Sequence, residues 1–258
     1  MNIVTEINAW QAIRKSLQQQ TIGFIPTMGN LHAGHLSLCE RSCAENNINV
    51  VSIFVNPMQF NQPEDFNQYP RTLGQDIALL SSLPIDYLLL PSIEALYPDC
   101  YQLQVQETVL STELEGLFRP GHFTGMLTIV LKLLNLVMPT HVYFCEKDYQ
   151  QLLLVKKLVQ ALFLPITVVA CATIRAEDGL ALSSRNARLT VQQRRHAAAF
   201  PRLLHSLLDT ETISVKLVEL GFKVEYIVEQ WGRILGAVWL GDVRLIDNVA
   251  FSSRMAEK

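Results

Sequence analysis

Short apolar runs alternate with longer segments of helical periodicity along the first 174 residues of the chain. The runs are continuous and rich in β-branched or aromatic side chains, as expected for strands buried on both faces of a sheet. These predicted strands cover residues 21–26, 49–55, 86–90, 141–144 and 165–171. The longer segments predict helices over residues 35–47, 73–83, 124–138 and 148–164, the last three of which end directly before a proline.

The alternation of strands and helices implies βαβ crossovers. It therefore predicts the α/β fold class, with a doubly wound parallel sheet. In such sheets ligands bind beyond the carboxyl ends of the strands. We expect the chemistry of this chain in the segments that follow residues 26, 55, 144 and 171.

The pattern changes after about residue 173. A polar loop over residues 175–186 leads to a predicted helix over residues 191–208, and a hairpin is expected around Gly241. Short strands are predicted over residues 223–228, 236–240 and 243–245. The chain is thus predicted to form two domains, residues 1–174 with the parallel sheet and residues 175–258 as a smaller α+β domain.

The composition favours a globular chain without membrane spans. Apolar residues make up 49% and charged residues 17% of the 258 residues, and the mean hydropathy is +0.20. Lys132 and Pro165 interrupt the most apolar stretches, so neither reaches the roughly 18 residues of a spanning helix. Because residues 1–20 also lack a signal-peptide core, we expect a cytoplasmic protein.

Charge and cysteine content narrow the function classes further. The net charge of −3, with no basic stripe, argues against a nucleic-acid binder. It leaves small anionic substrates open, because local potentials can differ in sign from the whole. The five cysteines form no CxxC pair, so we expect reduced and mostly buried thiols.

The sharpest chemical signal is PTMGNLHAGH over residues 26–35, directly after the first predicted strand. A glycine-containing turn that opens a helix presents backbone N–H groups and a positive helix end to an anion. His32 and His35 are three apart and share a face, so a polyanion would meet two imidazoles and several amides. The His-x-Gly-His pattern is typical of nucleotidylyl transferases, where it stabilises charge on the α-phosphate. Two structural or surface histidines are the alternative.

A second polar segment, FVNPMQF over residues 54–60, follows the next predicted strand. Pro57 favours extended geometry at Asn56. Gln59 brings both a donor and an acceptor, which suit a hydroxycarboxylate. An ordinary strand-ending turn is the alternative.

A third segment, CEKDYQQ over residues 145–151, follows the fourth predicted strand. Lys147 can meet phosphate as a compact cation, and Asp148 can cap the helix or bind ribose or metal. Gln151 lies one turn along the same face. A solvated helix start is the alternative.

Two further loops contain polar residues that are candidates for a function. In IRAEDGLALSSRN, residues 174–186, two serines beside Arg185 can grip phosphate through hydroxyls and a bidentate guanidinium, and the loop could close over a nucleotide. A domain linker is the alternative. In RPGHFTG, residues 119–125, His122 and Thr124 are interpreted as helix caps.

Taken together and in order, these segments resemble the pantoate–β-alanine ligase (pantothenate synthetase) family from about residue 20 to residue 249. The motifs that carry the resemblance are PTMGNLHAGH, FVNPMQF, FNQYPRTL, RPGHFTGMLTIVLKLLN, EKDYQQL, DGLALSSRNARL and WLGDVRLIDN. The resemblance implies a Rossmann-like N-terminal domain, a smaller C-terminal lid and a homodimer. It also implies an ATP- and Mg²⁺-dependent ligase that forms pantothenate from (R)-pantoate and β-alanine through pantoyl adenylate, releasing pyrophosphate and then AMP.

The resemblance also implies roles for individual residues, carried over by motif. His35, as the general acid of the family, acts with His32, Lys147 and Arg185 in catalysis. Gln59 and Gln151 hold pantoate, and Gln59 also lies at the β-alanine position. No protein metal ligand is assigned, and Mg²⁺ is expected mainly on the ATP phosphates. The expected ATP-binding residues are Met28, Gly29, Asn30, Leu31, His32, Ala33, Gly34, His35, Cys145, Glu146, Lys147, Asp148, Ile174, Leu182, Ser183, Ser184 and Arg185.

Three features depart from the family pattern. Cys145 replaces a glycine and adds a side chain near the expected nucleotide, so nucleotide affinity is the property most exposed to change. Leu182 replaces a methionine, a swap that conserves volume. The C-terminal part, residues 210–258, looks about twenty residues short.

Three other functions stay open at this point. A nucleotidylyl transferase would release a dinucleotide product and would not need β-alanine to release AMP. A silent binding protein would keep the fold without turnover. A nucleic-acid module of synthetase ancestry is disfavoured by the acidic charge balance.

Overall fold

The computed structural model describes residues 1–61 and 63–255. The chain divides into two compact units. The N-terminal unit holds Met1–Glu146 and Gln150–Cys171. The C-terminal unit holds Lys147–Tyr149 and the chain from Ala172 onward.

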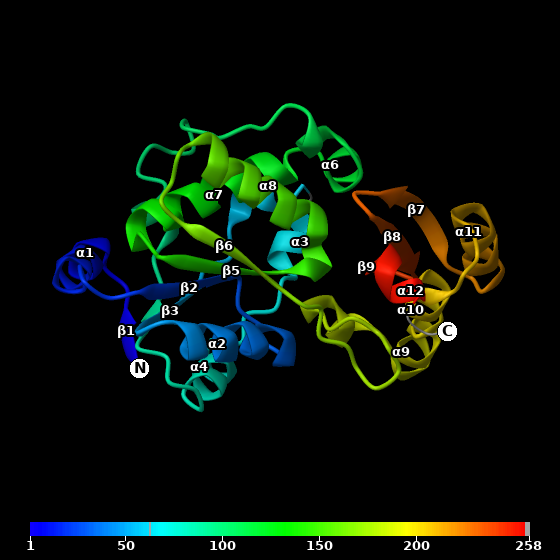
Figure 1. Cartoon of the computed structure of the whole chain (residues 1–258), viewed down its shortest axis with the longest axis horizontal. Coiled ribbons are helices and arrows are strands. Elements are labelled where there is room, and N and C mark those ends of the chain that lie inside the picture. The colour runs from blue at the N-terminus through cyan, green and yellow to red at the C-terminus, as the bar shows by residue number, and fades with distance from the viewer. Residues whose placement is uncertain (62, 256–258) are drawn as a thin grey trace. The chain divides into compact units, whose positions relative to one another are not determined.

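A six-stranded parallel sheet forms the centre of the N-terminal unit (Figure 1). Its strands lie in the order β1 (Asn2–Val4), β4 (Tyr87–Leu89), β3 (Ile48–Ile53), β2 (Ile22–Thr27), β5 (His141–Cys145) and β6 (Thr167–Cys171). The chain passes from β2 through β3 to β4 on one side and then continues through β5 and β6 on the other. The predicted doubly wound fold is confirmed, and the order of strands reverses between β2 and β5.

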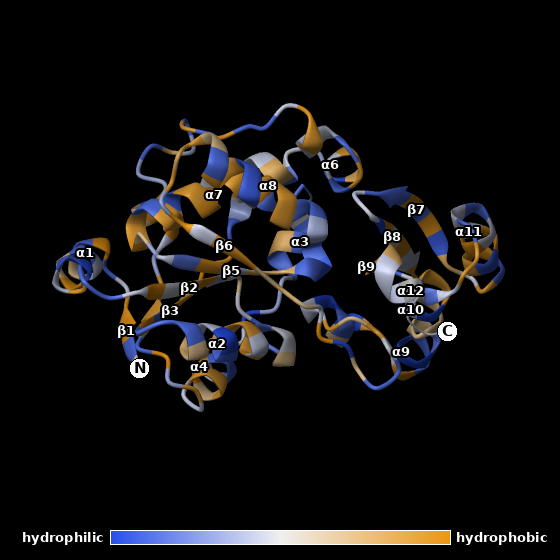
Figure 2. Cartoon of the chain, in the orientation of Figure 1, coloured by the Kyte–Doolittle hydropathy of each residue, from blue (hydrophilic) through white to orange (hydrophobic). Residues whose placement is uncertain are grey.

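Helices cover both faces of this sheet. Figure 1 shows α2 (Ala33–Glu45) and α4 (Leu73–Leu80) on one face, and α7 (His122–Val137) and α8 (Tyr149–Ala161) on the other. Apolar side chains of the strands and of α2 and α4 form one buried cluster, which agrees with the hydrophobic colour of the strands in Figure 2. The shorter elements are η1 (Pro57–Gln59), α3 (Pro63–Asn67), α5 (Ile93–Leu96), η2 (Leu110–Thr112), α6 (Glu115–Phe118) and η3 (Glu146–Asp148).

The sequence pattern did not predict the first two elements, β1 and α1 (Ile7–Ser16). β1 has only three residues, and α1 buries a single side chain, Trp10, so neither has a strong apolar period. Both are nevertheless anchored. Trp10 donates to the carbonyl of Leu136 (2.9 Å), and Arg14 donates to that of Val137 (2.9 Å), so α1 satisfies carbonyls at the end of α7.

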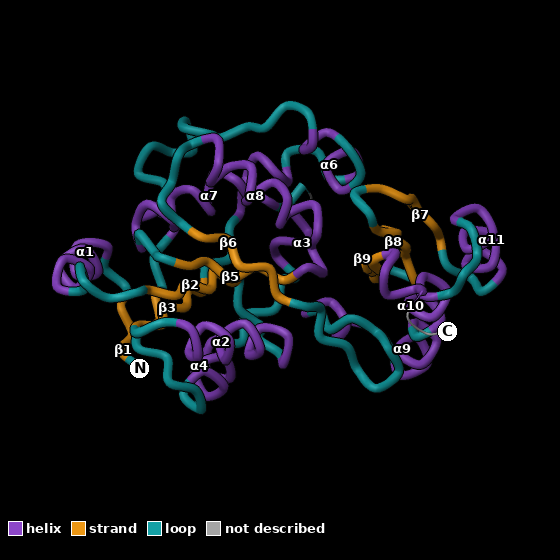
Figure 3. The backbone as a smooth tube through the Cα atoms, viewed as in Figure 1, coloured by secondary structure: helices purple, strands orange, loops and turns teal. Residues whose placement is uncertain are grey.

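The C-terminal unit is an antiparallel three-stranded sheet with helices packed on it (strands orange in Figure 3). The turn between the last two strands contains Gly241 at φ 59°, so the predicted hairpin is confirmed. The elements are η4 (Ser184–Arg188), α9 (Val191–Ala197), α10 (Ala199–His205), α11 (Thr210–Glu219), β7 (Lys223–Gln230), β8 (Arg233–Leu240), β9 (Val243–Ala250) and α12 (Phe251–Met255).

The single helix predicted over residues 191–208 is wrong. The chain forms two helices, with Ala198 between them. Pro201 has no N–H and would break the middle of a long helix. Restarting the helix at Ala199 puts Pro201 in a first turn, where an N–H has no partner within the helix.

No helix within residues 1–61 and 63–255 has both the length and the apolarity needed to cross a bilayer. The five cysteines all lie in these ranges, and none forms a disulfide. Cys39 and Cys171 are buried, whereas Cys100 is exposed. Burial raises the pKa of the Cys39 thiol to about 12 and also raises that of Cys171, so both are neutral thiols at pH 7.

Gly125 allows α7 to approach η1 closely. A Cβ at this position would lie 2.2 Å from the carbonyl oxygen of Met58, which is backbone and cannot turn aside. We expect Gly125→Ala to lower the free energy of unfolding by about 1–3 kcal/mol, because the backbones must separate. Urea unfolding checks this.

Gly74→Ala in α4 is the matched control. Among the described residues, nothing lies within 4 Å of a Cβ at Gly74, so its stability should stay unchanged or rise by up to about 1 kcal/mol. Equal stability of the Gly125→Ala protein and the unaltered protein would show that the two backbones can separate at no cost.

Candidate active site

The turn after β2 is fixed by a buried carboxylate from another helix. Gly29 (φ 80°) and Asn30 (φ 51°) both adopt left-handed geometry. Asp76 of α4, only 1% exposed, accepts from the backbone N–H of Asn30 (3.0 Å) and of Leu31 (2.8 Å), one on each carboxylate oxygen. A Cβ on Gly29 would meet Asp76 Oδ2 at 3.0 Å, so glycine is needed both for φ and for the close approach. The turn is therefore rigid.

The two histidines cap the start of α2 reciprocally. His32 Nδ1 accepts from the N–H of Gly34 (3.1 Å), and His35 Nδ1 accepts from the N–H of His32 (3.3 Å). A backbone N–H can only donate, so Nδ1 carries no hydrogen in either ring. Each neutral imidazole thus carries its hydrogen on Nε2. The ring centroids lie 4.2 Å apart, which gives two neighbouring N–H donors of the same tautomer.

The backbone amides of this turn are mostly engaged within the protein, contrary to the expectation that several would meet an anion. Gly29 N–H donates to Thr27 Oγ1 (3.2 Å), and His35 N–H donates to the carbonyl of His32 (2.8 Å). The amides of Asn30 and Leu31 are taken by Asp76. An anion at this turn would therefore meet the imidazoles more than the amides.

Gln59 lies at the end of η1 and is 8% exposed. Its amide Nε2 lies 2.8 Å from Met28 Sδ, which connects the segments after β2 and β3. Its Oε1 accepts from Asn56 Nδ2 (3.2 Å), and Asn56 has the extended geometry expected before Pro57. The structure thus brings together two of the predicted segments, through Met28 and Gln59.

Asn56 is itself fully buried and held on both sides. Its Nδ2 donates to the carbonyl of Gly125 (3.0 Å), and its Oδ1 accepts from the hydroxyl of Tyr97 (2.7 Å). Burial raises the pKa of the Tyr97 hydroxyl well above its ordinary value, so this hydroxyl remains a donor. Asn56 therefore serves as a support for Gln59.

His122 is the first residue of α7 and does not cap it. The N-cap is Gly121, and within the described chain no side chain caps this helix start. The His122 ring is buried, with Nδ1 2.8 Å from the carbonyl oxygen of Gln59 and Nε2 3.1 Å from Arg119 Nη1. The interpretation of His122 as a cap is therefore wrong.

Gln151 is half-buried on α8, and its neighbour Gln150 is 3% exposed. Cys145, at the end of β5, packs its side chain against the hydrophobic cluster that includes Cys171 and Ile25. The Cys145 side chain is thus partly buried and packs against the core.

Lys147 belongs to the C-terminal unit and is fixed by β9. Its carbonyl accepts from Asn248 Nδ2 (2.9 Å), and its Nζ lies 3.8 Å from Asp148 Oδ2. Arg233 also donates to Asn248 Oδ1 (2.5 Å). One buried amide in β9 therefore holds the backbone at Lys147.

The predicted phosphate loop is anchored by Asp247, the residue next to Asn248. Arg175 forms a two-pronged ion pair with Asp247, whose side chain is 1% exposed, at 2.6 and 2.9 Å. Ser183 Oγ accepts from the N–H of Arg185 (3.3 Å) and so begins η4. The adjacent residues Asp247 and Asn248 thus hold both segments of the C-terminal unit that the sequence assigned to the nucleotide.

The predicted site residues divide between the units. In the N-terminal unit are Met28, Gly29, Asn30, Leu31, His32, Ala33, Gly34, His35, Gln59, Cys145, Glu146 and Gln151; in the C-terminal unit are Lys147, Asp148, Ile174, Leu182, Ser183, Ser184 and Arg185. In the part of the chain that the structure describes, no cluster of three His, Cys, Asp or Glu side chains could hold a metal ion.

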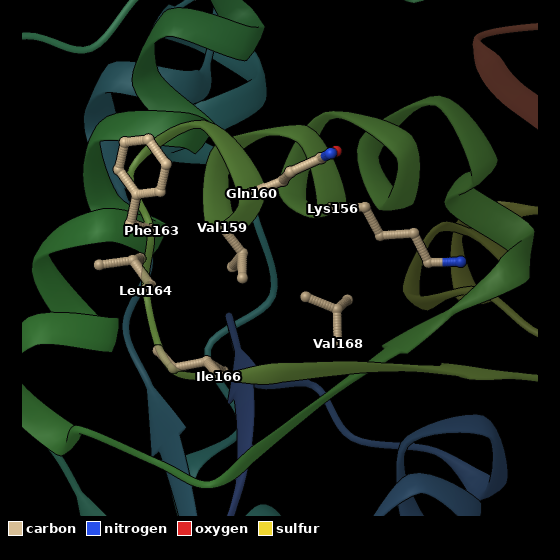
Figure 4. A pocket seen from close by; sticks show the side chains of 7 residues that line it. All are labelled: Lys156, Val159, Gln160, Phe163, Leu164, Ile166 and Val168. Atoms are coloured by element: carbon tan, nitrogen blue, oxygen red, sulfur yellow. The ribbon is translucent and has the colours of Figure 1, made fainter.

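An open groove of about 580 Å³ lies away from these residues, where α8 ends and β6 begins (Figure 4). It is lined by Lys156, Val159, Gln160, Phe163, Leu164, Ile166 and Val168. None of these is a predicted site residue, and the groove lies at the amino end of β6. A ligand site of a parallel sheet is expected at the opposite, carboxyl ends.

Comparison with known proteins gives one consistent result. The family model described as pantoate-beta-alanine ligase matches residues 2–250. The pantothenate synthetase of Coxiella burnetii (strain RSA 493 / Nine Mile phase I) is 50% identical over 250 residues, covering 97% of each chain. That of Legionella pneumophila (strain Corby) is 50% identical over 249 residues, covering 96% of this chain and 99% of that protein. The expected short C-terminal part is thus shared with these relatives.

Two solved structures agree with the sequence relatives. The pantoate-beta-alanine ligase of Francisella tularensis, complexed with beta-gamma ATP and beta-alanine, has a TM-score of 0.92 at 44% identity, with 97% of both chains covered. The pantothenate synthetase of Thermus thermophilus has a TM-score of 0.89 at 39% identity, with 97% of this chain and 99% of that chain covered.

The anchoring role of Asp76 can be tested directly. In Asp76→Asn, an amide NH2 group replaces one carboxylate oxygen. This group faces a backbone N–H, so two donors oppose each other. We expect the free energy of unfolding to fall by about 2 kcal/mol and amide exchange at Asn30 and Leu31 to accelerate. Hydrogen exchange followed by NMR measures both amides. Asp242→Asn, in an exposed turn, is the control, and slow exchange in both variants would contradict the assignment.

Proposed function

This chain belongs to the pantoate–β-alanine ligase family, and from that premise we propose that it joins (R)-pantoate to β-alanine through a pantoyl-adenylate intermediate. The carboxylate of pantoate attacks the α-phosphorus of ATP and pyrophosphate leaves. The amine of β-alanine then attacks the acyl carbon, AMP leaves, and the amine nitrogen loses a proton. The products are pantothenate, AMP and pyrophosphate.

The pair of Nε2–H imidazoles beside the switch point of the sheet is the observation that best supports this chemistry. Neither step needs a protein nucleophile. The first step instead brings two anions together and places new charge on phosphorus, which favours fixed donors and cations. His32 and His35 would donate from Nε2 to phosphate oxygens, with their orientation set by the α2 cap. His35 would be the acid of the pair.

Lys147 and Arg185 would supply the positive charge of the nucleotide site. Both lie in segments that are anchored on β9, through Asn248 and through the Arg175–Asp247 ion pair. Lys147 is a compact cation, whereas Arg185 can bind two phosphate oxygens at once. The same nucleotide site would be lined by Ile174, Leu182, Ser183 and Ser184. These assignments follow from the motifs.

Gln59 and Gln151 would bind pantoate. A carboxamide offers both donors and an acceptor, which matches a substrate with hydroxyl and carboxylate groups. Gln59 is only 8% exposed, and this burial would exclude water from its hydrogen bonds and strengthen them. Exclusion of water also protects an acyl adenylate from hydrolysis.

Mg²⁺ would be held mainly by the phosphates of ATP. This ion keeps several waters and binds through one or two carboxylates together with substrate phosphates, so it needs no cage of protein ligands. Asp148, with 46% of its side chain exposed, is a carboxylate of the predicted nucleotide segment that could join it. When bound, the ion neutralises phosphate charge. The homodimer is a further proposal from the family resemblance, and the cytoplasmic location is one from the sequence.

The decisive assay is AMP and pantothenate formation by the purified protein with ATP, Mg²⁺ and pantoate, with and without β-alanine. We expect both products in equal amounts and only with all components present. Pyrophosphate without pantothenate would mean another amine acceptor, and a dinucleotide product would mean a nucleotidylyl transferase. ATP binding without turnover would indicate a silent binder. His35→Gln should lower turnover by about 100-fold, and His205→Gln on α10 should leave it unchanged.

The replacement of glycine by Cys145 is expected to affect stability more than nucleotide binding, because the partly buried side chain packs against the core. In Cys145→Gly, the free energy of unfolding should fall by about 1–3 kcal/mol, and the Kd for ATP should change less than twofold. Calorimetry and urea unfolding measure these. Cys100→Gly is the control, since Cys100 is exposed at φ 51° and gains nothing from its side chain. Tighter ATP binding by Cys145→Gly would show instead that the thiol faces the nucleotide.

A further inference from the structure

The turn that carries Gln59 is weakly held by its own backbone. Within η1, the N–H of Gln59 lies 3.4 Å from the carbonyl of Asn56, and the N–H of Phe60 lies 3.3 Å from that of Pro57. Both distances exceed the usual 2.9–3.0 Å of an N–H···O bond. The position of Gln59 must therefore be set by contacts from outside the turn.

Met28 contacts the side chain of Gln59, and His122 contacts its backbone carbonyl. The Nδ1 of His122 lies 2.8 Å from the carbonyl oxygen of Gln59, which can only accept, so Nδ1 carries the hydrogen. Its Nε2 lies 3.1 Å from Arg119 Nη1, which can only donate, so Nε2 carries none. His122 is therefore neutral, with its hydrogen on Nδ1, the opposite tautomer to His32 and His35.

Arg119 is in turn held by Glu115. Their charged groups lie 3.6 Å apart, with 15% and 10% of the two side chains exposed. The backbone N–H of Glu115 donates to Gln150 Oε1 (3.0 Å). Gln150 Nε2 donates to the carbonyls of Leu110 and Glu113, at 2.8 Å each. The buried side-chain amide of Gln150 thus fixes the backbone where α6 begins. The residue directly before α6 is Leu114, whose φ of 43° and ψ of −112° are strained.

These contacts form a continuous chain from α8 to η1. It begins at Gln150, next to Gln151, and passes through Glu115, Arg119 and His122 to the backbone of Gln59. One end of this chain of contacts is thus Gln59, and the other end is Gln150, the direct neighbour of Gln151. Gln59 and Gln151 are the two glutamines assigned to pantoate. Every member lies in the N-terminal unit.

We propose that His122 is a positioning residue for substrate. It fixes the carbonyl of Gln59 and, through Arg119, Glu115 and Gln150, keeps Gln59 and Gln151 in a fixed position relative to each other. The inference rests on the proposed function for the identity of the substrate. It assigns His122 no contact with substrate and no proton transfer. Its effect is on the affinity for pantoate and β-alanine, which Gln59 would bind.

Two substitutions test the contacts of the two ring nitrogens of His122 separately. Asparagine places an amide N–H where Nδ1 stood, so His122→Asn keeps the donor to Gln59 and loses the acceptor to Arg119. Glutamine places its amide where Nε2 stood, so His122→Gln keeps the contact with Arg119 and loses that with Gln59. We expect KM for pantoate to rise about tenfold in His122→Gln and to stay within about threefold in His122→Asn. KM for ATP should be unchanged in both.

The melting temperature of each variant shows whether both proteins are folded. Equal KM values for pantoate in the two folded variants, or a KM for ATP that rises in parallel, would overturn the proposal. These outcomes would mean a general structural role for the ring.

A second measurement needs neither turnover nor a variant. Long-range ¹H–¹⁵N NMR of the unaltered protein reports which ring nitrogen carries the hydrogen. We expect Nδ1–H for His122 and Nε2–H for His32 and His35, and an Nε2–H or doubly protonated His122 would overturn the inference. If the unaltered protein makes no pantothenate, the proposed function fails, and this spectrum still decides whether His122 holds Gln59.

Discussion

The contact between the Asp76 carboxylate and two backbone amides is the constraint on which the rest of the site depends. It fixes two consecutive left-handed residues, Gly29 and Asn30, in front of α2. The orientation of His32 and His35 follows, because their reciprocal cap can form only if the chain enters the helix in that geometry. Met28 is placed by the same turn and contacts Gln59. Since Asp76 belongs to α4, the crossover between β3 and β4, the packing of the sheet determines the geometry of this turn.

The sequence predicted those features that depend on local pattern. The central strands are apolar throughout, because they are buried on both faces, and the predicted residues 21–26 and 49–55 agree with β2 and β3. Parallel topology then placed the polar segments at one edge of the sheet. The pattern failed where an element was short or nearly without buried residues, as with β1 and α1, and where Pro201 divides one apparent helix into α9 and α10.

The supporting residues of the site could not be found in this way, because their partners are distant in sequence. Asp76 and Leu31 are 45 residues apart, His122 and Gln59 are 63 apart, and Arg175 and Asp247 are 72 apart. Each pair meets only because the fold brings two elements together. In the motif RPGHFTG the histidine at the helix start was visible, but its role was not. Its partner, a backbone carbonyl, has no signature in any sequence.

The C-terminal unit is assembled from two separate pieces of chain, since Lys147–Tyr149 belongs to it although the chain then returns to α8. Asn248 binds the carbonyl of Lys147, and Arg233 lies 4.3 Å above the ring of Tyr149. A fragment that starts at Ala172 would lack both partners. The unit is therefore not a module that recombination could transfer to another protein by a single crossover. Its inheritance is linked to that of the turn after β5, and changes in either must be compatible with the other.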